Sequence, residues 1–286
     1  MNRWITGARP RTLPAAVVPV AVGAAAAVGE PGDIVWWRVG AALVVSLALQ
    51  VGVNYANDYS DGVRGTDDVR VGPTRLVASG LASPSSVKRA AMSAFGVAAV
   101  CGLAIALSTS LWLLVVGAAA IAAGWFYTGG PRPYGYMGLG EVFVFVFFGL
   151  VATAGTTFAA IESATALSLV MGAAVGSLAC ALLVINNLRD IPTDREVGKQ
   201  TLAVRLGDHR TRWLYVVLIV AAFVLCAVAA AWSVPVVLTF LALPVAIAPV
   251  RSVLRGAIGP ALIPVLGATA KLQLAWGILA TIGLVL

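Results

Sequence analysis

Charged residues are scarce in this chain: Lys, Arg, Asp and Glu make up 11% of its 286 residues, whereas 60% are hydrophobic. Soluble domains carry roughly a quarter charged residues, so this composition excludes an ordinary soluble protein and indicates an integral membrane protein. Histidine occurs only at His209, in the charged segment GDHRTR, where we expect a solvated loop residue rather than a catalytic base. Cys101, Cys180 and Cys226 stand singly in separate apolar runs, which excludes a cysteine metal site or redox pair and indicates packing residues.

The net charge of +7 comes without any Lys/Arg run that contains interleaved aromatic residues, so the sequence argues against nucleic-acid binding. The basic residues instead describe a membrane topology. If the N-terminus is cytoplasmic, every Lys and Arg except Arg38 and Lys271 falls in a cytoplasmic segment. The positive-inside rule therefore predicts a multi-pass protein of the cell membrane with a cytoplasmic N-terminus and an external C-terminus.

Long apolar runs fill most of the chain, and most of them approach the roughly 20 residues that a helix needs to cross a bilayer. They cover 14–29, 35–57, 90–108, 111–128, 139–161, 164–187, 213–232, 234–251 and 264–286. The sequence therefore predicts an all-α integral membrane protein with about nine transmembrane helices.

Two acidic stretches end two of these runs: NYANDYSDGVRGTDD from Asn54 to Asp68, and NNLRDIPTDREVGK from Asn186 to Lys199. If each continues as a helix, its acidic and amide side chains recur every three or four residues and share one face. The first set is Asn54, Asn57, Asp58 and Asp61, and the second is Asn186, Asp190 and Asp194. Both stretches fall on the cytoplasmic side of the predicted topology, and acidic residues at a membrane helix are best interpreted as a functional site.

Converging carboxylates require cations, because each close pair repels by roughly 3 to 4 kcal/mol at an effective dielectric constant near 20. Carboxylate and amide oxygens suit Mg²⁺, which usually takes one or two carboxylates together with waters and the oxygens of a substrate phosphate. The sequence therefore predicts a Mg²⁺ site that binds a phosphate ester, with its active site on the cytoplasmic side.

Further side chains on the same side are candidates for substrate binding. They are Arg64, Arg75, Tyr127, Arg132, Lys199 and Lys271, with the amides Asn54, Asn57 and Asn186. For Lys271 snorkelling to the surface is an equal alternative, and for the tyrosines of 127–141 an interfacial aromatic belt is another. Arg9 and Arg11 are either topology signals or donors to an anionic substrate. We expect the long polar connections at about 58–89 and 188–212 to act as lids.

At NDYSD and DIPTD the chain resembles the UbiA family of membrane prenyltransferases, over most of its length. The flanking segments YTGGPRPYGYMGLGE and NNLRDIPTDREVGKQTLAVRLG are similar to the branch that prenylates 1,4-dihydroxy-2-naphthoate in menaquinone synthesis. The resemblance implies a single domain over 1–286, a helical bundle with a central cavity open toward lipid, and a polyprenyl diphosphate bound through Mg²⁺. It implies that Asn54, Asp58 and Asp61 hold one ion and that Asp190 and Asp194 hold the second, the four aspartates being catalytic.

The implied reaction expels diphosphate, shields the allylic cation with aromatic side chains and lets the naphthoate ring attack with loss of CO₂. The fifth run offers Phe143, Phe145, Phe147 and Phe148 for this wall. Another aromatic acceptor, such as 4-hydroxybenzoate or homogentisate, is the alternative within the same class. A transporter is the alternative outside it, since intramembrane acids also mark ion pathways. The acids lie at helix ends, however, and no charged relay crosses the bilayer centre. A non-catalytic lipid-binding subunit would have no reason to carry two acidic clusters.

Overall fold

The computed structural model describes residues 2–66 and 74–286, and within them the secondary structure is helical without β-strands. The α-helices are α1 Arg3–Ala8, α2 Pro14–Ala25, α3 Trp36–Arg64, α4 Pro84–Ser108, α5 Trp112–Phe126, α6 Gly140–Val144, α7 Ala152–Ile161, α8 Ala166–Glu196, α9 Leu202–Ala229, α10 Leu243–Leu254 and α11 Leu262–Val285. A π-helical turn, η3 Phe145–Val151, joins α6 to α7. Short 3₁₀ helices are η1 Pro10–Thr12, η2 Tyr134–Met137, η4 Val234–Ala242 and η5 Gly259–Ala261. The all-α prediction is confirmed.

Seven helical segments of the described chain are long and apolar enough to cross a membrane. They are Trp36–Arg64, Pro84–Ser108, Gly140–Ile161, Ala166–Glu196, Leu202–Ala229, Val234–Leu254 and Gly259–Val285. The predicted runs 14–29 and 111–128 instead form α2, with 12 residues, and α5, with 15 residues. A helix of α2's length spans only about 18 Å, so a count of nine full transmembrane helices is not confirmed.

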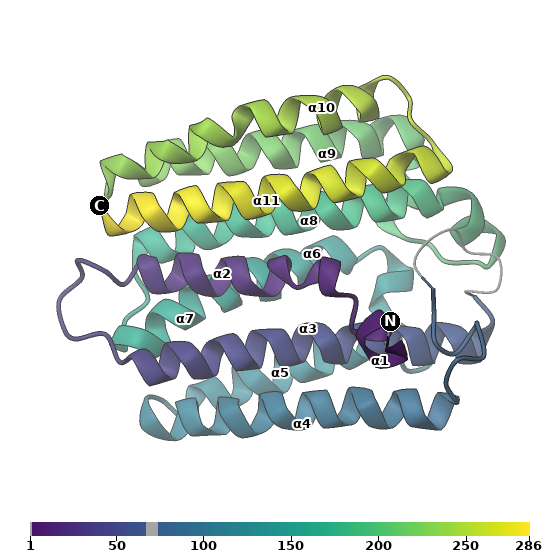
Figure 1. Ribbon diagram of the computed structural model, residues 1–286, viewed down its shortest axis with the longest axis horizontal. Helices are drawn as coiled ribbons and strands as arrows, with labels where there is room; N and C mark the ends of the chain where they lie inside the picture. The colour runs from purple at the N-terminus through teal and green to yellow at the C-terminus, as the bar shows by residue number, and fades with distance from the viewer. Residues whose placement is uncertain (1, 67–73) are drawn as a thin grey trace.

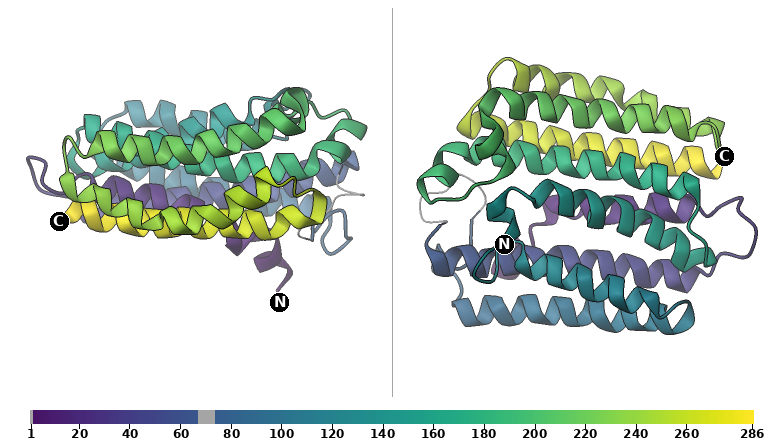
Figure 2. Two further views of the ribbon diagram at one scale, coloured as in Figure 1. Left: turned by 90° about the horizontal axis from the view of Figure 1, so that it is seen from above. Right: turned by 180° about the vertical axis from the view of Figure 1, so that it is seen from behind.

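The helices lie side by side in two layers. In Figure 1, α2 and α11 lie in front of α6, α7 and α8, and the reverse view in Figure 2 brings α8 and the α6–α7 segment to the front. One hydrophobic cluster is built from α8, α9 and α11 with α2, and a second is built from α3 and α4 with flanking residues of α1 and α5. A large cavity lies between these two packed parts.

The acidic and amide side chains predicted to share a face, at 54–61 and 186–194, lie in the last turns of long helices rather than in loops. Helix α3 continues to Arg64 and ends at Gly65, whose φ of 71° favours glycine. Helix α8 begins with a capping box between Thr165 and Ser168 and continues to Glu196. The C-terminal ends of α3 and α8 lie at the same end of the bundle as α1, whereas the chain's C-terminus lies at the opposite end (Figure 1).

The connections predicted as lids are shorter than expected for this reason. The first starts only after Arg64, its residues 67–73 lie outside the described part of the chain, and α4 begins at Pro84. In the second, residues 188–196 belong to α8 and 197–201 form the connection, while α9 is interrupted within 202–212 by a kink at Gly207, whose φ of 76° and ψ of 170° are not helical. The segment predicted as a loop at 188–212 is therefore mostly helical, because its charged residues continue the ends of α8 and α9, and its action as a lid stays a prediction.

Candidate active site

A cavity of about 1030 Å³ lies between the two hydrophobic clusters. Its inner walls come from apolar faces of α2, α3, α4, α5, α7, α8 and α11. Its polar end is lined by the last turns of α3 and α8 and by nearby connections. Among the predicted residues this end includes Asn54, Asn57, Asp61, Arg75, Tyr127, Asn186, Asp190, Asp194 and Lys199. The structure thus brings residues of both acidic stretches to one polar mouth above an apolar chamber.

Asp61 is the point at which the two stretches meet. The residue is 3% exposed, and its Oδ1 atom accepts a hydrogen bond of 2.6 Å from the Tyr136 hydroxyl. Lys199 follows the end of α8, and its Nζ atom lies 3.5 Å from the same oxygen and 4.7 Å from the centre of the Tyr136 ring. The backbone N–H of Lys199 donates to the Asp194 carbonyl at 2.8 Å, which fixes the lysine to the end of α8.

The Tyr136 hydroxyl remains a donor over a wide pH range. Burial raises its pKa first, and the negative charge of Asp61 and the hydrogen bond to Asp61 raise it further. Tyr127 lines the cavity beside it, and burial followed by the charge of Glu141 raises the pKa of Tyr127 well above its usual value. Both phenols are therefore neutral groups at physiological pH.

In the second stretch, Asp190 is paired with its neighbour Arg189. The Arg189 Nε and Nη2 atoms donate to the two carboxylate oxygens at 2.6 and 2.8 Å, and Nη2 also donates to Asn186 Oδ1 at 2.8 Å. Arg189 lines the cavity but was not among the predicted site residues. The sequence does distinguish Arg189, because it is the only basic residue between Asn186 and Asp194 and stands next to the predicted metal ligand Asp190.

The two asparagines of α3 serve different partners. The Asn57 Oδ1 atom accepts from the Thr128 hydroxyl at 2.8 Å. The Asn54 amide donates to the Ala8 carbonyl at 2.9 Å and to Thr12 Oγ1 at 3.0 Å. Asn54 therefore also holds the segment that carries Arg9 and Arg11, both of which line the cavity.

Asp58 does not line the cavity, in contrast to the other members of its predicted face. It is 0% exposed, and its two oxygens accept hydrogen bonds from the backbone N–H groups of Leu76 and Val77 at 2.8 and 3.0 Å. The i, i+3, i+4 spacing places Asp58 on a broad helical face with Asn57 and Asp61, but Asp58 is rotated by about 100° from Asn57 around the helix axis. The structure thus places this carboxylate against the connection after α3.

Three predicted substrate contacts lie away from the cavity. Arg64 is exposed, donates to the carbonyls of Thr128 and Gly130 and stacks 5.5 Å from the Tyr136 ring centre, so it clamps the connection between α5 and α6. Arg132 is exposed in that connection. Lys271 is exposed on α11, whereas Gln273, two residues further on, is buried and lines the cavity. The prediction that these three residues line the substrate site is therefore corrected: none of them lines the cavity, because the direction of a single side chain cannot be read from the sequence.

The predicted aromatic wall is present in part. Phe143, Phe147 and Phe148 line the cavity, with ring centres of Tyr134 and Phe143 at 3.9 Å and those of Phe143 and Phe147 at 6.1 Å. Phe145 is not among the lining residues and lies against Gly176 of α8. The π-helical turn produces this arrangement, because its wider turn shifts the register of the side chains.

The charges that line the cavity favour an anion. Five cationic side chains and three carboxylates contribute, namely Arg9, Arg11, Arg75, Arg189 and Lys199 with Asp61, Asp190 and Asp194. Among the described residues, no three Asp, Glu, His or Cys side chains group closely enough to hold a metal by themselves. The oxygen donors nevertheless suit a hard cation that completes its coordination with water, amide and phosphate oxygens.

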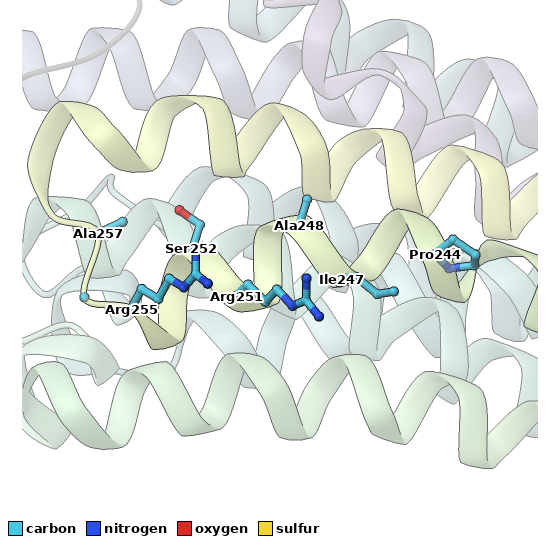
Figure 3. Close-up of a pocket in the computed structure, with 8 residues that line it drawn as sticks. Pro244, Ile247, Ala248, Arg251, Ser252, Arg255 and Ala257 are labelled. Atoms are coloured by element: carbon cyan, nitrogen blue, oxygen red, sulfur yellow. The ribbon is translucent and has the colours of Figure 1, made fainter.

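A second hollow lies on the outer surface at residues 244–257, in α10 and the turn that follows (Figure 3). Arg251 and Arg255 line it, and neither lines the central cavity. These arginines lie at the same end of the bundle as the acidic helix ends, where the positive-inside rule places basic residues.

The fold and the site define a polytopic membrane protein with a polar mouth, lined by five cationic side chains and three carboxylates, that opens on an apolar chamber. Residues 16–259 match the profile of the UbiA prenyltransferase family. The chain belongs to this family, as its two acidic stretches indicated.

Curated relatives support this membership, and solved structures share the fold. The chain is 50% identical to the 1,4-dihydroxy-2-naphthoate octaprenyltransferase of Mycobacterium tuberculosis over 96% of this chain and 94% of the relative. It is 35% identical to the Escherichia coli protein of the same name, over 99% and 95%. Its fold is similar to the apo structure of a UbiA homolog from Aeropyrum pernix K1, with a TM-score of 0.68, 19% identity and coverage of 96% and 97%. A UbiA homolog from Archaeoglobus fulgidus bound to DMAPP and Mg²⁺ gives a TM-score of 0.60 at 16% identity, covering 98% and 99%.

Proposed function

We propose that the protein transfers a polyprenyl group from polyprenyl diphosphate to 1,4-dihydroxy-2-naphthoate, releasing diphosphate and CO₂. The product is demethylmenaquinone in its quinol form. The observation that carries this proposal is the junction of Asp61 and Lys199, which joins the two acidic helix ends directly above a chamber lined by apolar and aromatic residues. The high identity to relatives named as naphthoate octaprenyltransferases supports the choice of acceptor over 4-hydroxybenzoate or homogentisate.

The polar mouth is the proposed diphosphate site. Asp61 on one side and Asp190 with Asp194 on the other would hold two Mg²⁺ ions, one at each helix end, and Asn57 and Asn186 add amide oxygens. When bound, Mg²⁺ supplies charge stabilisation for the departing diphosphate. Arg75, Arg189 and Lys199 line the same mouth and would bind phosphate oxygens as negative charge develops there.

The chamber then controls the fate of the allylic carbon. The carbon–oxygen bond breaks with its electron pair passing to diphosphate, and the electron-rich naphthoate ring forms the new carbon–carbon bond. Loss of the carboxylate as CO₂ returns an electron pair to the ring, so no base is needed to remove a ring proton. The rings of Phe143 and Phe147, with Tyr134, stabilise the cation through their π-faces and exclude water that would quench it.

The distribution of basic residues indicates how the protein lies in the membrane. We propose that the end with α1 and the acidic helix ends faces the cytoplasm and that the C-terminus lies outside, in agreement with the distribution of Lys and Arg. We also propose that 1–286 is one prenyltransferase domain, because both hydrophobic clusters enclose a shared cavity.

The direct test is an assay of the purified protein in nanodiscs with one polyprenyl diphosphate and three acceptors: 1,4-dihydroxy-2-naphthoate, 4-hydroxybenzoate and homogentisate. We expect prenylated product, diphosphate and CO₂ in equal amounts with the naphthoate only, and no product after Mg²⁺ is removed. Preference for another acceptor would refute the proposed substrate, and release of no diphosphate with any acceptor would refute the reaction class.

A further inference from the structure

Asp58 is fully buried, yet it does not reach the cavity that its neighbours Asn57 and Asp61 line. Both of its carboxylate oxygens are bonded to consecutive backbone N–H groups, Leu76 to Oδ2 and Val77 to Oδ1. Charge-assisted hydrogen bonds of this kind are stronger than neutral ones, and a carboxylate that is 0% exposed has no room for hydrated metal. This geometry requires a role other than metal coordination.

The residue immediately before these two N–H groups is Arg75. It is 8% exposed and lines the cavity that also contains Asp61 and Lys199. Its carbonyl accepts the Ser79 N–H at 3.1 Å, so Arg75 begins a compact turn. Any shift of the turn would therefore move the arginine relative to the mouth of the cavity.

Packing against α3 fixes the same turn. Leu76 is fully buried in the cluster around Tyr55, and its Cδ1 atom lies within van der Waals range of Gly7 of α1. Val77 lies so close to Gly62 that a Cβ atom at that glycine would come within 2.6 Å of Val77 Cβ. Asp58 lies one helical turn before Gly62, so one side of α3 serves as a docking surface for the turn.

We propose that Asp58 is a positioning residue, which holds the 75–80 turn so that Arg75 meets the diphosphate, and that it is not a metal ligand. The proposal rests on the diphosphate site described above. Helix α3 would then have two separate functions. Asn57 and Asp61 face the substrate, and Asp58 anchors the 75–80 turn, whose Arg75 binds the diphosphate.

The experiment compares Asp58→Asn, Arg75→Ala and the double variant as full-length protein in nanodiscs. Mn²⁺ alone, followed by electron paramagnetic resonance, probes the metal site, and inorganic pyrophosphate with Mg²⁺, followed by calorimetry, probes the anion site. We expect Asp58→Asn to bind Mn²⁺ within about twofold of wild type and to weaken pyrophosphate binding about 10- to 100-fold, as Arg75→Ala does. The double variant should bind pyrophosphate no more weakly than Arg75→Ala.

A metal ligand would behave differently. A loss of about tenfold or more in Mn²⁺ affinity for Asp58→Asn, or multiplied losses in the double variant, would overturn the proposal. Val77→Pro is the second variant in case Asp58→Asn does not fold: it retains the carboxylate but removes one N–H donor. It should raise the KM for polyprenyl diphosphate without raising the Mg²⁺ concentration needed for half-maximal rate, and a wild-type KM would count against the anchor.

The proposed function and this role fail in distinguishable ways. If the wild-type protein binds Mn²⁺ and pyrophosphate but transfers no prenyl group, the function is wrong while the binding data still decide the role of Asp58. If the wild-type protein binds no pyrophosphate, both are wrong.

Discussion

Replacing Asp61 by Asn is the most informative single change, because the substitution keeps the size of the side chain and removes its charge. In the structure this carboxylate lies 3.5 Å from Lys199 Nζ, and the Asp61 side chain is 5% exposed. At an effective dielectric constant near 20, the attraction lost at that distance is about 5 kcal/mol, an upper limit before solvation is counted. The Tyr136 hydroxyl also loses a charged acceptor at 2.6 Å.

We therefore expect Asp61→Asn to lower kcat/KM for prenyl transfer by about 100- to 1000-fold, the range seen when one preorganised electrostatic group is removed from an active site. The assay is steady-state product formation from polyprenyl diphosphate and the naphthoate over a series of Mg²⁺ concentrations. Asp33→Asn is the matched control, because Asp33 is an exposed carboxylate in the connection between α2 and α3. Turnover by Asp61→Asn that equals that of the control would refute the site.

Three further changes test other parts of the structure. Tyr136→Phe should lower kcat/KM about 10- to 100-fold because Asp61 loses its hydrogen-bond donor. Since burial and Asp61 raise the pKa of Tyr136, the wild-type rate should show no loss from deprotonation of this phenol between pH 7 and about 10. A fall in the wild-type rate over this range that disappears in Tyr136→Phe would contradict the prediction. Gly149→Val should destabilise the protein by about 1 to 3 kcal/mol, because its Cβ would lie 2.5 Å from Gly176 Cα; an unchanged melting temperature in detergent would exclude this close packing of η3 on α8. Arg38→Ala should lower the free energy of unfolding by about 1 to 2 kcal/mol, because the Ser108 carbonyl loses its donor and the ion pair with the exposed Glu162 is lost. Thermal melting in nanodiscs measures this, with Arg132→Ala, an exposed arginine, as the control. Equal melting temperatures for the two variants would contradict the prediction.

The sequence predicts that both acidic stretches lie at helix ends on one side of the bundle, because the apolar runs define the helices and the spacing of the acidic residues continues them. Long apolar runs must become membrane helices, and basic residues select the side on which each run ends. Asp61, Asp190 and Asp194 follow directly, since they continue the runs of α3 and α8 and line the cavity.

The direction of individual side chains could not be read in the same way. Asp58 fits the i, i+4 spacing from Asn54 but lies at the edge of the shared face, and its contact with Leu76 and Val77 then holds it away from the cavity that Asp61 lines. Phe145 likewise turns toward Gly176 because a π-helical turn changes the register, which a period of 3.6 residues does not anticipate. Arg189 was overlooked because its pairing with Asp190 joins adjacent residues, a contact that helical-face reasoning does not consider.

The measurement that addresses the central claim most directly is a structure of the protein with Mn²⁺ and a non-hydrolysable prenyl thiodiphosphate, with the metal located by its anomalous signal. We expect Mn²⁺ peaks beside Asp61 and beside Asp190 or Asp194, with the thiodiphosphate between the two helix ends and no peak at Asp58. Metal at Asp58, or a thiodiphosphate bound away from both α3 and α8, would contradict the account.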